Sequence, residues 1–301
     1  MKIADAFEEF VSYATLERCL EINTIGWYKR CVKPYLKYLR YNALESTLTS
    51  LDVKTLRAYY ISHRLRGNAP RSILNAMQGM RSFCNFLVKR GYLPENPLNH
   101  IEKPKLARRL PEFLDEKESR ELLLACINLK RMYKSRWSRD VAIIALFLYA
   151  GLRKRELLNL TLNDINMDKR YIKVFAKSKE RIVSLNETVK EFLADYLKVR
   201  PKRENVPQVF VSTNRKQSAL TEQGLYDLFR DLRKQIHFQK KVTPQILRHT
   251  FCTLMLRGGV NIRDIQLLVG HADISTTARF YLGCDEKQLG GAIDRHPLNF
   301  N

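Results

Sequence analysis

Four short segments of this 301-residue chain carry side chains whose types and spacing suit an anionic ligand such as a phosphate. In the first segment, Arg153 follows a fully apolar stretch that is expected to be a buried helix, and Glu156 lies three residues further on. A carboxylate at this spacing can hold the guanidinium, and an arginine oriented in this way can bind an oxyanion through two hydrogen bonds. From this segment alone, an ordinary ion pair at the end of a helix is the simpler interpretation.

In the second segment, Thr243 and Pro244 are expected to begin a helix, because threonine is a good N-cap and proline a good first helical residue. Gln245 and Arg248 are three residues apart, so they are predicted to share one face near the positive end of the helix dipole. Free backbone amides, an arginine and the dipole together suit a phosphate. His249 is predicted to point elsewhere and to be a structural hydrogen-bonding residue.

The last two segments each contain one residue of interest, a histidine and a tyrosine. Gly270 is expected to end a helix and to leave His271 on a turn, where a lone histidine is usually a surface residue. Tyr281 follows ten residues later, and a tyrosine in such a segment is usually a core or interface aromatic. Each of the four signals is weak by itself, so a functional interpretation depends on their occurring together and in order.

Helical periodicity predicts that the first hundred residues, which must help to position these segments, form α-helices only. The apolar stripes of these helices are interpreted as a packed core, with the basic residues lying off the stripes. The four expected helices are 4–20, 23–36 with a kink or break at Pro34, one capped by Ser50 or Asp52, and 70–91.

The proline-rich and basic segment 103–111 is predicted to be an extended linker between domains. After it, Asp115 and Glu118 form the capping-box pattern of a new helix. The second half mixes element types, and a hairpin is expected around Lys177 and Lys179. The elements predicted there are a buried helix over 141–149, strands over 171–176 and 181–185, and helices over 187–199, 223–235, 244–256 and 262–269.

The composition narrows the class of protein and of partner. The chain carries 53 Lys and Arg against 31 Asp and Glu, a formal net charge of +22. This excess is spread over both halves, so nucleic acid is the leading candidate partner, ahead of an anionic membrane surface or ribosomal RNA. The longest apolar run, 141–152, is too short to cross a bilayer, and the N-terminus lacks an apolar stretch of signal-peptide type. The six scattered cysteines indicate reduced thiols in a cytosolic protein.

As an ordered set, the motifs resemble those of the tyrosine recombinase (phage integrase) family, most closely its Xer-type members. The resemblance covers nearly the whole chain. It extends to the first half because the segment 21–24, followed by Tyr28, is similar to the start of the family's core-binding domain. It implies a multidomain fold: an all-α, SAM-like core-binding domain over 1–102, a linker over 103–111, and a catalytic domain over 112–301. The catalytic domain would be mainly α-helical with a small β-sheet and would end in a C-terminal tail.

The resemblance also implies a role for each motif. Arg153 and Arg248 would bind the scissile phosphate, and Lys177 would be the general acid for the leaving 5′-hydroxyl. His271 would donate a hydrogen bond to the phosphate, and Tyr281 would be the nucleophile. The remaining residues expected to contact the phosphate or the DNA are Gln245, Lys179, Arg181, Arg71 and Arg81.

Three details of the sequence qualify these assignments. Gln245 stands where the family usually has histidine, and glutamine can donate a hydrogen bond but cannot transfer a proton. The spacing from His271 to Tyr281 is ten, whereas a spacing of nine, common in Xer-type members, would end on Phe280, which has no nucleophile. Lys179 is the alternative to Lys177 in the hairpin.

The implied function is site-specific DNA recombination through a 3′-phosphotyrosine intermediate and a Holliday junction. Four protomers would assemble on duplex DNA sites, with a related recombinase or accessory proteins as further partners, and no membrane, metal or cofactor is expected. The biological task would be dimer resolution or the integration and excision of a mobile element, in the cytoplasm on the nucleoid. The alternatives are a type IB topoisomerase-like enzyme, a non-catalytic DNA-binding protein, and a metal-dependent transposase or nuclease.

Overall fold

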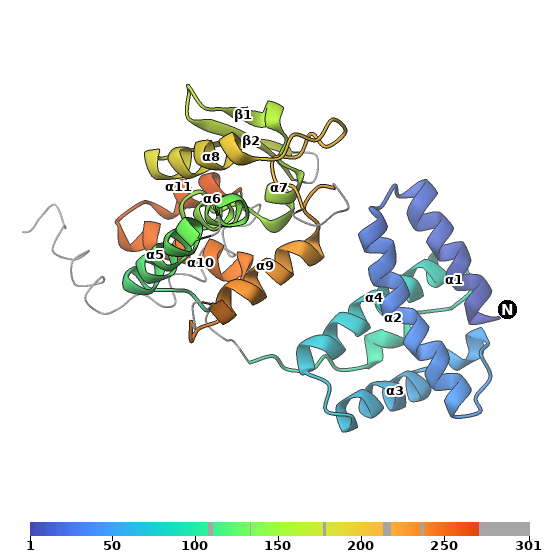
Figure 1. The fold of residues 1–301 in the computed structure, drawn as a ribbon. Coiled ribbons are helices and arrows are strands. Elements are labelled where there is room, and N and C mark those ends of the chain that lie inside the picture. Colours follow the sequence, from blue (N-terminus) through green and yellow to red (C-terminus); the bar gives the residue numbers. More distant parts are fainter. Residues whose placement is uncertain (108–110, 133, 177–178, 213–217, 236–237, 271–301) are drawn as a thin grey trace, which may run out of the picture. The chain divides into compact units, whose positions relative to one another are not determined.

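The chain folds into two compact units, Met1–Arg108 and Arg109–Asn301 (Figure 1). This computed structural model describes residues 1–107, 111–132, 134–176, 179–212, 218–235 and 238–270. The division falls inside the segment 103–111, which the sequence predicts to be a linker. Within the described ranges, no helix is both long enough and apolar enough to span a membrane.

The N-terminal unit contains helices only, as its sequence predicts, in the part that the structure describes. Its core is rich in aromatic rings, and the Phe7 and Phe83 rings meet edge to face with centroids 5.4 Å apart. The α-helices are α1 (Ile3–Ser12), α2 (Ile22–Tyr41), α3 (Val53–Leu65) and α4 (Pro70–Lys89), and shorter helical turns cover Tyr13–Glu17, Leu48–Ser50 and Pro97–His100.

Two details of this unit differ from the sequence prediction. Helix α2 continues through Pro34 to Tyr41, although proline removes one backbone hydrogen bond. Val32, Tyr35 and Leu39 on either side of the proline are fully buried, so packing against the core holds both halves of the helix in line. The predicted helix over 4–20 is shorter, because α1 ends at Ser12 and a π-helical turn follows.

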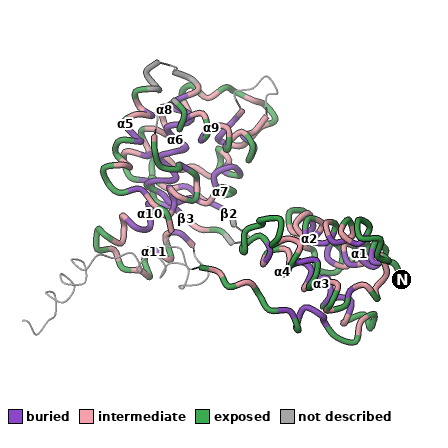
Figure 2. Tube along the Cα trace, turned by 90° about the horizontal axis from the view of Figure 1, so that it is seen from below, coloured by how far each residue is buried: buried purple, intermediate pink, exposed green. Residues whose placement is uncertain are grey.

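The C-terminal unit is built around one buried helix, α6 (Lys134–Ala150), which corresponds to the apolar run of the sequence. Helices α5 (Glu116–Met132), α8 (Glu187–Val199) and α10 (Pro244–Arg257) pack around α6 (Figures 1 and 2). The other elements in chain order are α7 (Lys154–Asn159), β1 (Ile165–Asn166), β2 (Tyr171–Ala176), β3 (Lys179–Ser184), α9 (Glu222–Gln235) and α11 (Ile262–Val269).

The strands form one antiparallel sheet in the order β1-β2-β3. Side chains alternate between its faces, and Ile172 pairs with Val183 on the buried face. Val174, also buried, pairs with Arg181, so the register directs this arginine toward the interior of the unit. The predicted hairpin is therefore present, with β3 starting two residues earlier than expected and with a two-residue strand, β1, that periodicity did not predict.

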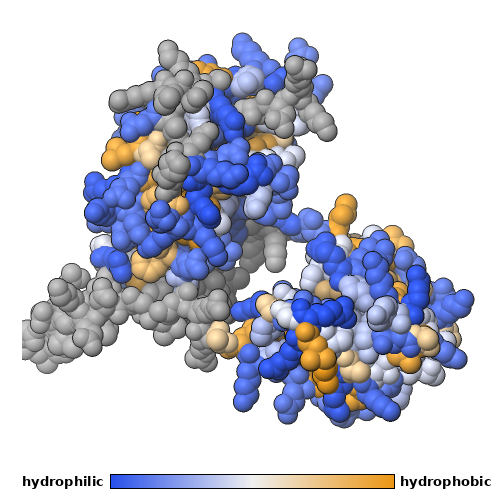
Figure 3. Space-filling model, turned by 60° about the horizontal axis from the view of Figure 1, so that its bottom comes forward, coloured by the Kyte–Doolittle hydropathy of each residue, from blue (hydrophilic) through white to orange (hydrophobic). Residues whose placement is uncertain are grey.

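Each unit has a hydrophobic core of its own. The larger core of the C-terminal unit contains α6, the sheet and α8, and a small separate cluster joins α10 to α11 through Phe251, Cys252, Ile265 and Val269. The visible surface of both units is mostly hydrophilic, with scattered hydrophobic spots (Figure 3). The five cysteines in the described ranges are free thiols, and four of them are buried.

Candidate active site

Arg153 lies at the start of α7 rather than at the end of the apolar helix. Helix α6 stops at Ala150, and Gly151 then turns the chain with a φ of +58°, at a point where a Cβ would overlap the Phe251 ring. Arg153 is the N-cap of α7, and its backbone N–H donates to Glu156 Oε2 at 2.7 Å. Its Nη1 donates to Glu156 Oε1 at 2.6 Å, which confirms the predicted Arg–Glu pair.

Arg248 lies in the interior of α10, and its side chain is only 9% exposed. Its Nη1 donates to the carbonyl of Gly151, and its Nη2 donates to the carbonyl of Val269 at 2.6 Å. Burial, and next the positive charge of Arg153, lower the pKa of Arg248 to about 10, against the opposing charge of Glu156. The guanidinium is therefore still charged at neutral pH, and it is held between the turn before α7 and the end of α11.

Glu156 is the fully buried carboxylate that these cations share. Besides Arg153, it accepts hydrogen bonds from Arg181 Nε at 3.3 Å and from Arg181 Nη2 at 2.8 Å. Arg248 Nη1 lies 3.9 Å from its Oε2. Burial raises the pKa of Glu156, but the hydrogen bonds and charge of Arg181, followed by the hydrogen bonds of Arg153, outweigh burial and lower it. The site thus combines three guanidinium groups with one ionised carboxylate.

The C-terminal end of α11 brings the three arginines together. The helix ends at Gly270, which has a φ of +65°, as the sequence predicts for this glycine. Three successive backbone carbonyls each accept a hydrogen bond from a different arginine: Leu268 from Arg181, Val269 from Arg248 and Gly270 from Arg153. Cations are favourable at this end of a helix, where the carbonyls lack partners within the helix.

The start of α10 follows the sequence prediction in its backbone, and its two predicted phosphate ligands differ in burial. Thr243 caps the helix by accepting a hydrogen bond from the Ile246 N–H at 3.2 Å, and Pro244 is the first helical residue. Gln245 is exposed in the first turn, whereas Arg248, one turn further on, is buried. His249 is hydrogen-bonded to the backbone of Glu112, and burial lowers its pKa, so it is a structural residue as expected.

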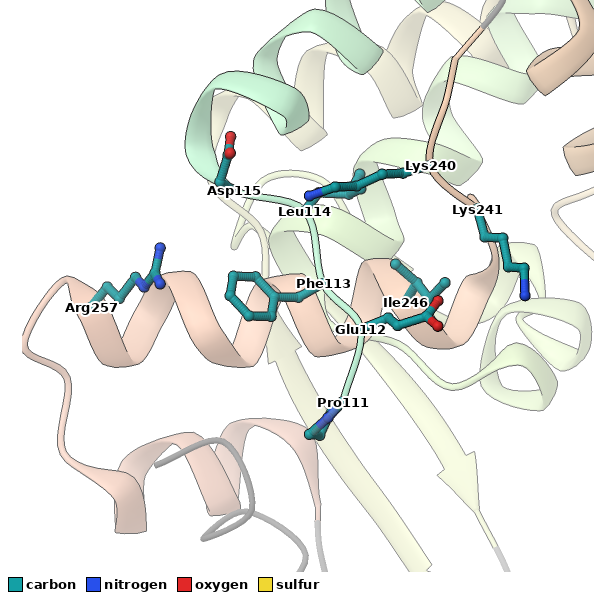
Figure 4. Close-up of a pocket in the computed structure, with 9 residues that line it drawn as sticks. All are labelled: Pro111, Glu112, Phe113, Leu114, Asp115, Lys240, Lys241, Ile246 and Arg257. Atoms are coloured by element: carbon teal, nitrogen blue, oxygen red, sulfur yellow. The ribbon is translucent and has the colours of Figure 1, made fainter. Parts of the chain in front are cut away.

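A pocket of about 660 Å³ lies where the segment 111–115 crosses α10 (Figure 4). The backbone N–H of Leu114 donates to Thr250 Oγ1 at 2.9 Å, and the Arg257 guanidinium lies 5.1 Å from the centre of the Phe113 ring. None of the three clustered arginines lines this pocket. These two contacts instead attach the segment 111–115, near the start of the C-terminal unit, to α10, the helix that carries Arg248.

The other predicted residues have varied outcomes. Lys177, His271 and Tyr281 lie outside the described residues, and of Lys179 the structure gives only the backbone, at the start of β3. Arg71 is exposed in the first turn of α4. The positions predicted to contact DNA also include Arg81 and Arg181.

Two of the residues predicted to contact DNA form hydrogen bonds within the protein. Arg81 donates to Asn99 Oδ1 at 2.7 Å and to the carbonyl of Leu98 at 2.6 Å. Arg181 is bound to Glu156 and to the end of α11, as described above. The sequence analysis did not predict that Arg181 joins the arginine cluster. The signal was present, because side chains alternate along β3 and Arg181 therefore lies on the same face as the buried Val183.

Comparison with known proteins gives the chain its family. Residues 112–287 match the model of the phage integrase family, and residues 7–91 match the model of the phage integrase N-terminal SAM-like domain. A tyrosine recombinase XerD of Listeria monocytogenes is 32% identical over 277 residues, which cover 91% of this chain and 92% of the relative. A tyrosine recombinase XerD of Staphylococcus epidermidis is 32% identical over 288 residues, which cover 94% of this chain and 95% of the relative.

Solved structures share the fold. The Tn1549 transposon integrase in complex with transposon right end DNA aligns with a TM-score of 0.75 and 19% identity, covering 98% of this chain and 99% of that one. The XerH site-specific recombinase bound to palindromic difH substrate aligns with a TM-score of 0.76 and 20% identity, covering 96% of this chain and 83% of that one. With both units matched and the arginine cluster built as described, the chain belongs to the phage integrase family of tyrosine recombinases.

Proposed function

We propose that the chain is a site-specific DNA recombinase that cleaves and rejoins duplex DNA through a 3′-phosphotyrosine intermediate. One observation carries the proposal: Arg153 and Arg248, 95 positions apart in the sequence, donate to adjacent carbonyls at the end of α11. These carbonyls belong to Val269 and Gly270, so His271, the next residue, is the third donor. Two guanidinium groups and one imidazole can together neutralise the negative charge on a phosphate.

The chemistry needs no outside source of energy. The Tyr281 hydroxyl gives its proton to His271 as its oxygen attacks phosphorus, the bond from phosphorus to the 5′-oxygen breaks, and Lys177 gives that oxygen a proton. A 5′-hydroxyl of a second strand then attacks the phosphotyrosine ester and releases the tyrosine. In this rejoining step both protons return. Arg153, Arg248 and His271 stabilise the charge that develops on the non-bridging oxygens, each contributing about 2–4 kcal/mol if it resembles an oxyanion-hole donor.

Gln245 fits this chemistry as a donor to the phosphate. It is exposed in the first turn of α10, where backbone N–H groups and the helix dipole favour an anion. Because an amide cannot transfer protons, acid–base work is left to Lys177 and His271. Arg71, exposed at the start of α4, and Lys179 contact the DNA backbone outside the reacting linkage.

The partners follow from the chemistry of strand exchange. Related chains have been solved on DNA, including XerH on difH substrate and the Tn1549 integrase on transposon DNA, which supports duplex DNA as the substrate. Exchange between two duplexes through a Holliday junction requires four active sites, so four protomers assemble on paired sites. The biological task is dimer resolution or the integration and excision of a mobile element, carried out on DNA in the cytoplasm.

The decisive experiment uses a duplex with a nick just downstream of the scissile linkage, so that the released fragment diffuses away. The chain is expected to form a covalent adduct that survives denaturant, and mass spectrometry should locate the DNA on Tyr281. Tyr281→Phe should abolish the adduct and keep DNA binding, whereas Tyr226→Phe, at an exposed tyrosine of α9, should change neither.

Two outcomes would contradict the proposal. An adduct that persists in Tyr281→Phe would assign the nucleophile to another residue. Relaxation of supercoiled plasmids with no preference for a sequence, together with the lack of any paired complex, would favour a type IB topoisomerase.

A further inference from the structure

We infer that Arg181 is a positioning residue of the recombination reaction, holding Glu156 and the end of α11 together so that Arg153 and Arg248 face one phosphate. The inference rests on the proposed function and goes beyond it, since Arg181 is not one of the residues assigned to the reacting groups. It also replaces the expectation that Arg181 contacts DNA.

The hydrogen bonds of Arg181 join three separate segments. Residue 181 lies in β3, and its side chain is only 14% exposed. Nε and Nη2 donate to the two oxygens of Glu156 in α7, at 3.3 Å and 2.8 Å, and Nη1 donates to the carbonyl of Leu268 in α11. All three nitrogens of the guanidinium are therefore engaged within the protein, which leaves the group poorly placed to contact DNA.

The stem of Arg181 also fills the space beside Gly270, the C-cap of α11. A Cβ added to Gly270 would lie 2.9 Å from Arg181 Cδ and 3.3 Å from its Nε. The arginine is thus packed directly against the backbone that leads to His271. A movement of Arg181 would be transmitted to Gly270 and, through the Gly270 carbonyl, to Arg153.

The charges explain why a cation is needed at this position. Glu156 is fully buried, and the cations that face it in the described structure are Arg153, Arg181 and the more distant Arg248. Arg181 is the largest of the influences that keep the pKa of Glu156 low against the effect of burial. Without Arg181, the Glu156 carboxyl group would take up a proton at a higher pH. Arg153 would then donate to a neutral group instead of a carboxylate in a larger fraction of the molecules.

The test replaces Arg181 by methionine, which keeps an unbranched stem, and by lysine, which keeps the charge. The readouts are the rate of adduct formation on the nicked duplex at saturating DNA, the dissociation constant and its salt dependence, and the melting temperature. The matched control is Arg170→Met, because Arg170 is exposed and pairs with Glu187 at 2.6 Å on the surface of the same unit.

Arg181→Met should slow adduct formation by about 10- to 100-fold, as expected when reacting groups are misplaced by a fraction of an ångström. The dissociation constant should stay within about threefold of the wild-type value, and the salt slope should be unchanged, since a lost phosphate contact would reduce it by about one. The low-pH fall of the adduct rate should move to higher pH, and Arg181→Lys should restore part of the rate. Arg170→Met should match the wild type.

A double variant separates positioning from an independent contribution. If Arg181 acts through Glu156, Arg181→Met should slow the reaction much less in a Glu156→Gln background than in the wild type. Equal factors in the two backgrounds, or weaker DNA binding with a reduced salt slope, would overturn the inference. If Arg181→Met melts below the assay temperature, the same comparison is made with Arg181→Lys. A wild-type chain without an adduct would refute the proposed function, whereas an active Arg181→Met would refute only the role of Arg181.

Discussion

Gly270→Ala should disable the site through one added methyl group. At a φ of +65°, alanine is strained by about 1–2 kcal/mol. The new Cβ would also lie 2.9 Å from Arg181 Cδ, whereas carbon atoms in contact prefer about 3.5–4.0 Å. The arginine stem must therefore move by roughly 0.6–1 Å, although the guanidinium is held by Glu156 at one side and Leu268 at the other.

This movement costs at least one hydrogen bond to a charged group, or about 1.5–3 kcal/mol. Together with the backbone strain, Gly270→Ala should lose roughly 2.5–5 kcal/mol of unfolding free energy. In a unit of this size, each kcal/mol lowers the melting temperature by about 2–4 °C. The rate of adduct formation should fall by tens of fold, because a misplacement of about 1 Å can cost 100-fold.

Gly259→Ala is the matched control. Gly259 also has a positive φ, of +84°, but an added Cβ would meet nothing within 4 Å. It should therefore show the backbone strain alone and keep the adduct rate of the wild type. Melting curves of both variants and the adduct assay on the nicked duplex give the comparison. Equal losses of stability and equal adduct rates in the two variants would refute the reasoning from contact with Arg181.

Three further predictions concern single side chains. Arg81→Ala should destabilise the N-terminal unit by about 1–3 kcal/mol through the lost bond to Leu98, and a salt slope of DNA binding reduced by about one would instead make Arg81 a phosphate contact. Glu156→Gln should lower stability by about 2–3 kcal/mol at neutral pH. Because the folded-state pKa of Glu156 is lowered, this deficit should be complete above the ordinary value of 4.5 and shrink in pH-dependent unfolding as the pH falls through the lower value. Thr250→Val should cost about 1–3 kcal/mol in chemical denaturation by removing the acceptor of the Leu114 N–H, and an unchanged midpoint would contradict that bond.

Local signals in the sequence predicted those parts of the fold that depend on nearby residues. The bounds of α8 and α11 agree with the predicted 187–199 and 262–269, because Asn186 caps the one helix and Gly270 ends the other. The capping box of α5 is present, with the Asp115 and Glu118 side chains each accepting from the other's backbone N–H. The hairpin of β2 and β3 is also present, because the side chains of its strands alternate regularly between the two faces of the sheet.

Features decided by distant contacts were predicted less well. The continuation of α2 through Pro34 depends on the burial of Tyr35 and Leu39, which local helix rules do not register. Arg181 has the charge of a DNA contact, and only the packing of β3 against α7 and α11 gives it internal partners. The roles of Lys177, His271 and Tyr281 stay predictions.

The row of carbonyls at the end of α11 also governs when the site can exist during synthesis of the chain. Gly270 lies 117 positions after Arg153, and Leu268 lies 87 positions after Arg181, so the acceptors are translated long after the donors. A nascent polypeptide that has not reached this stretch has Glu156 but lacks the three carbonyls that accept hydrogen bonds from the arginines. The full arrangement of the three arginines can therefore form only after residue 270 has been translated.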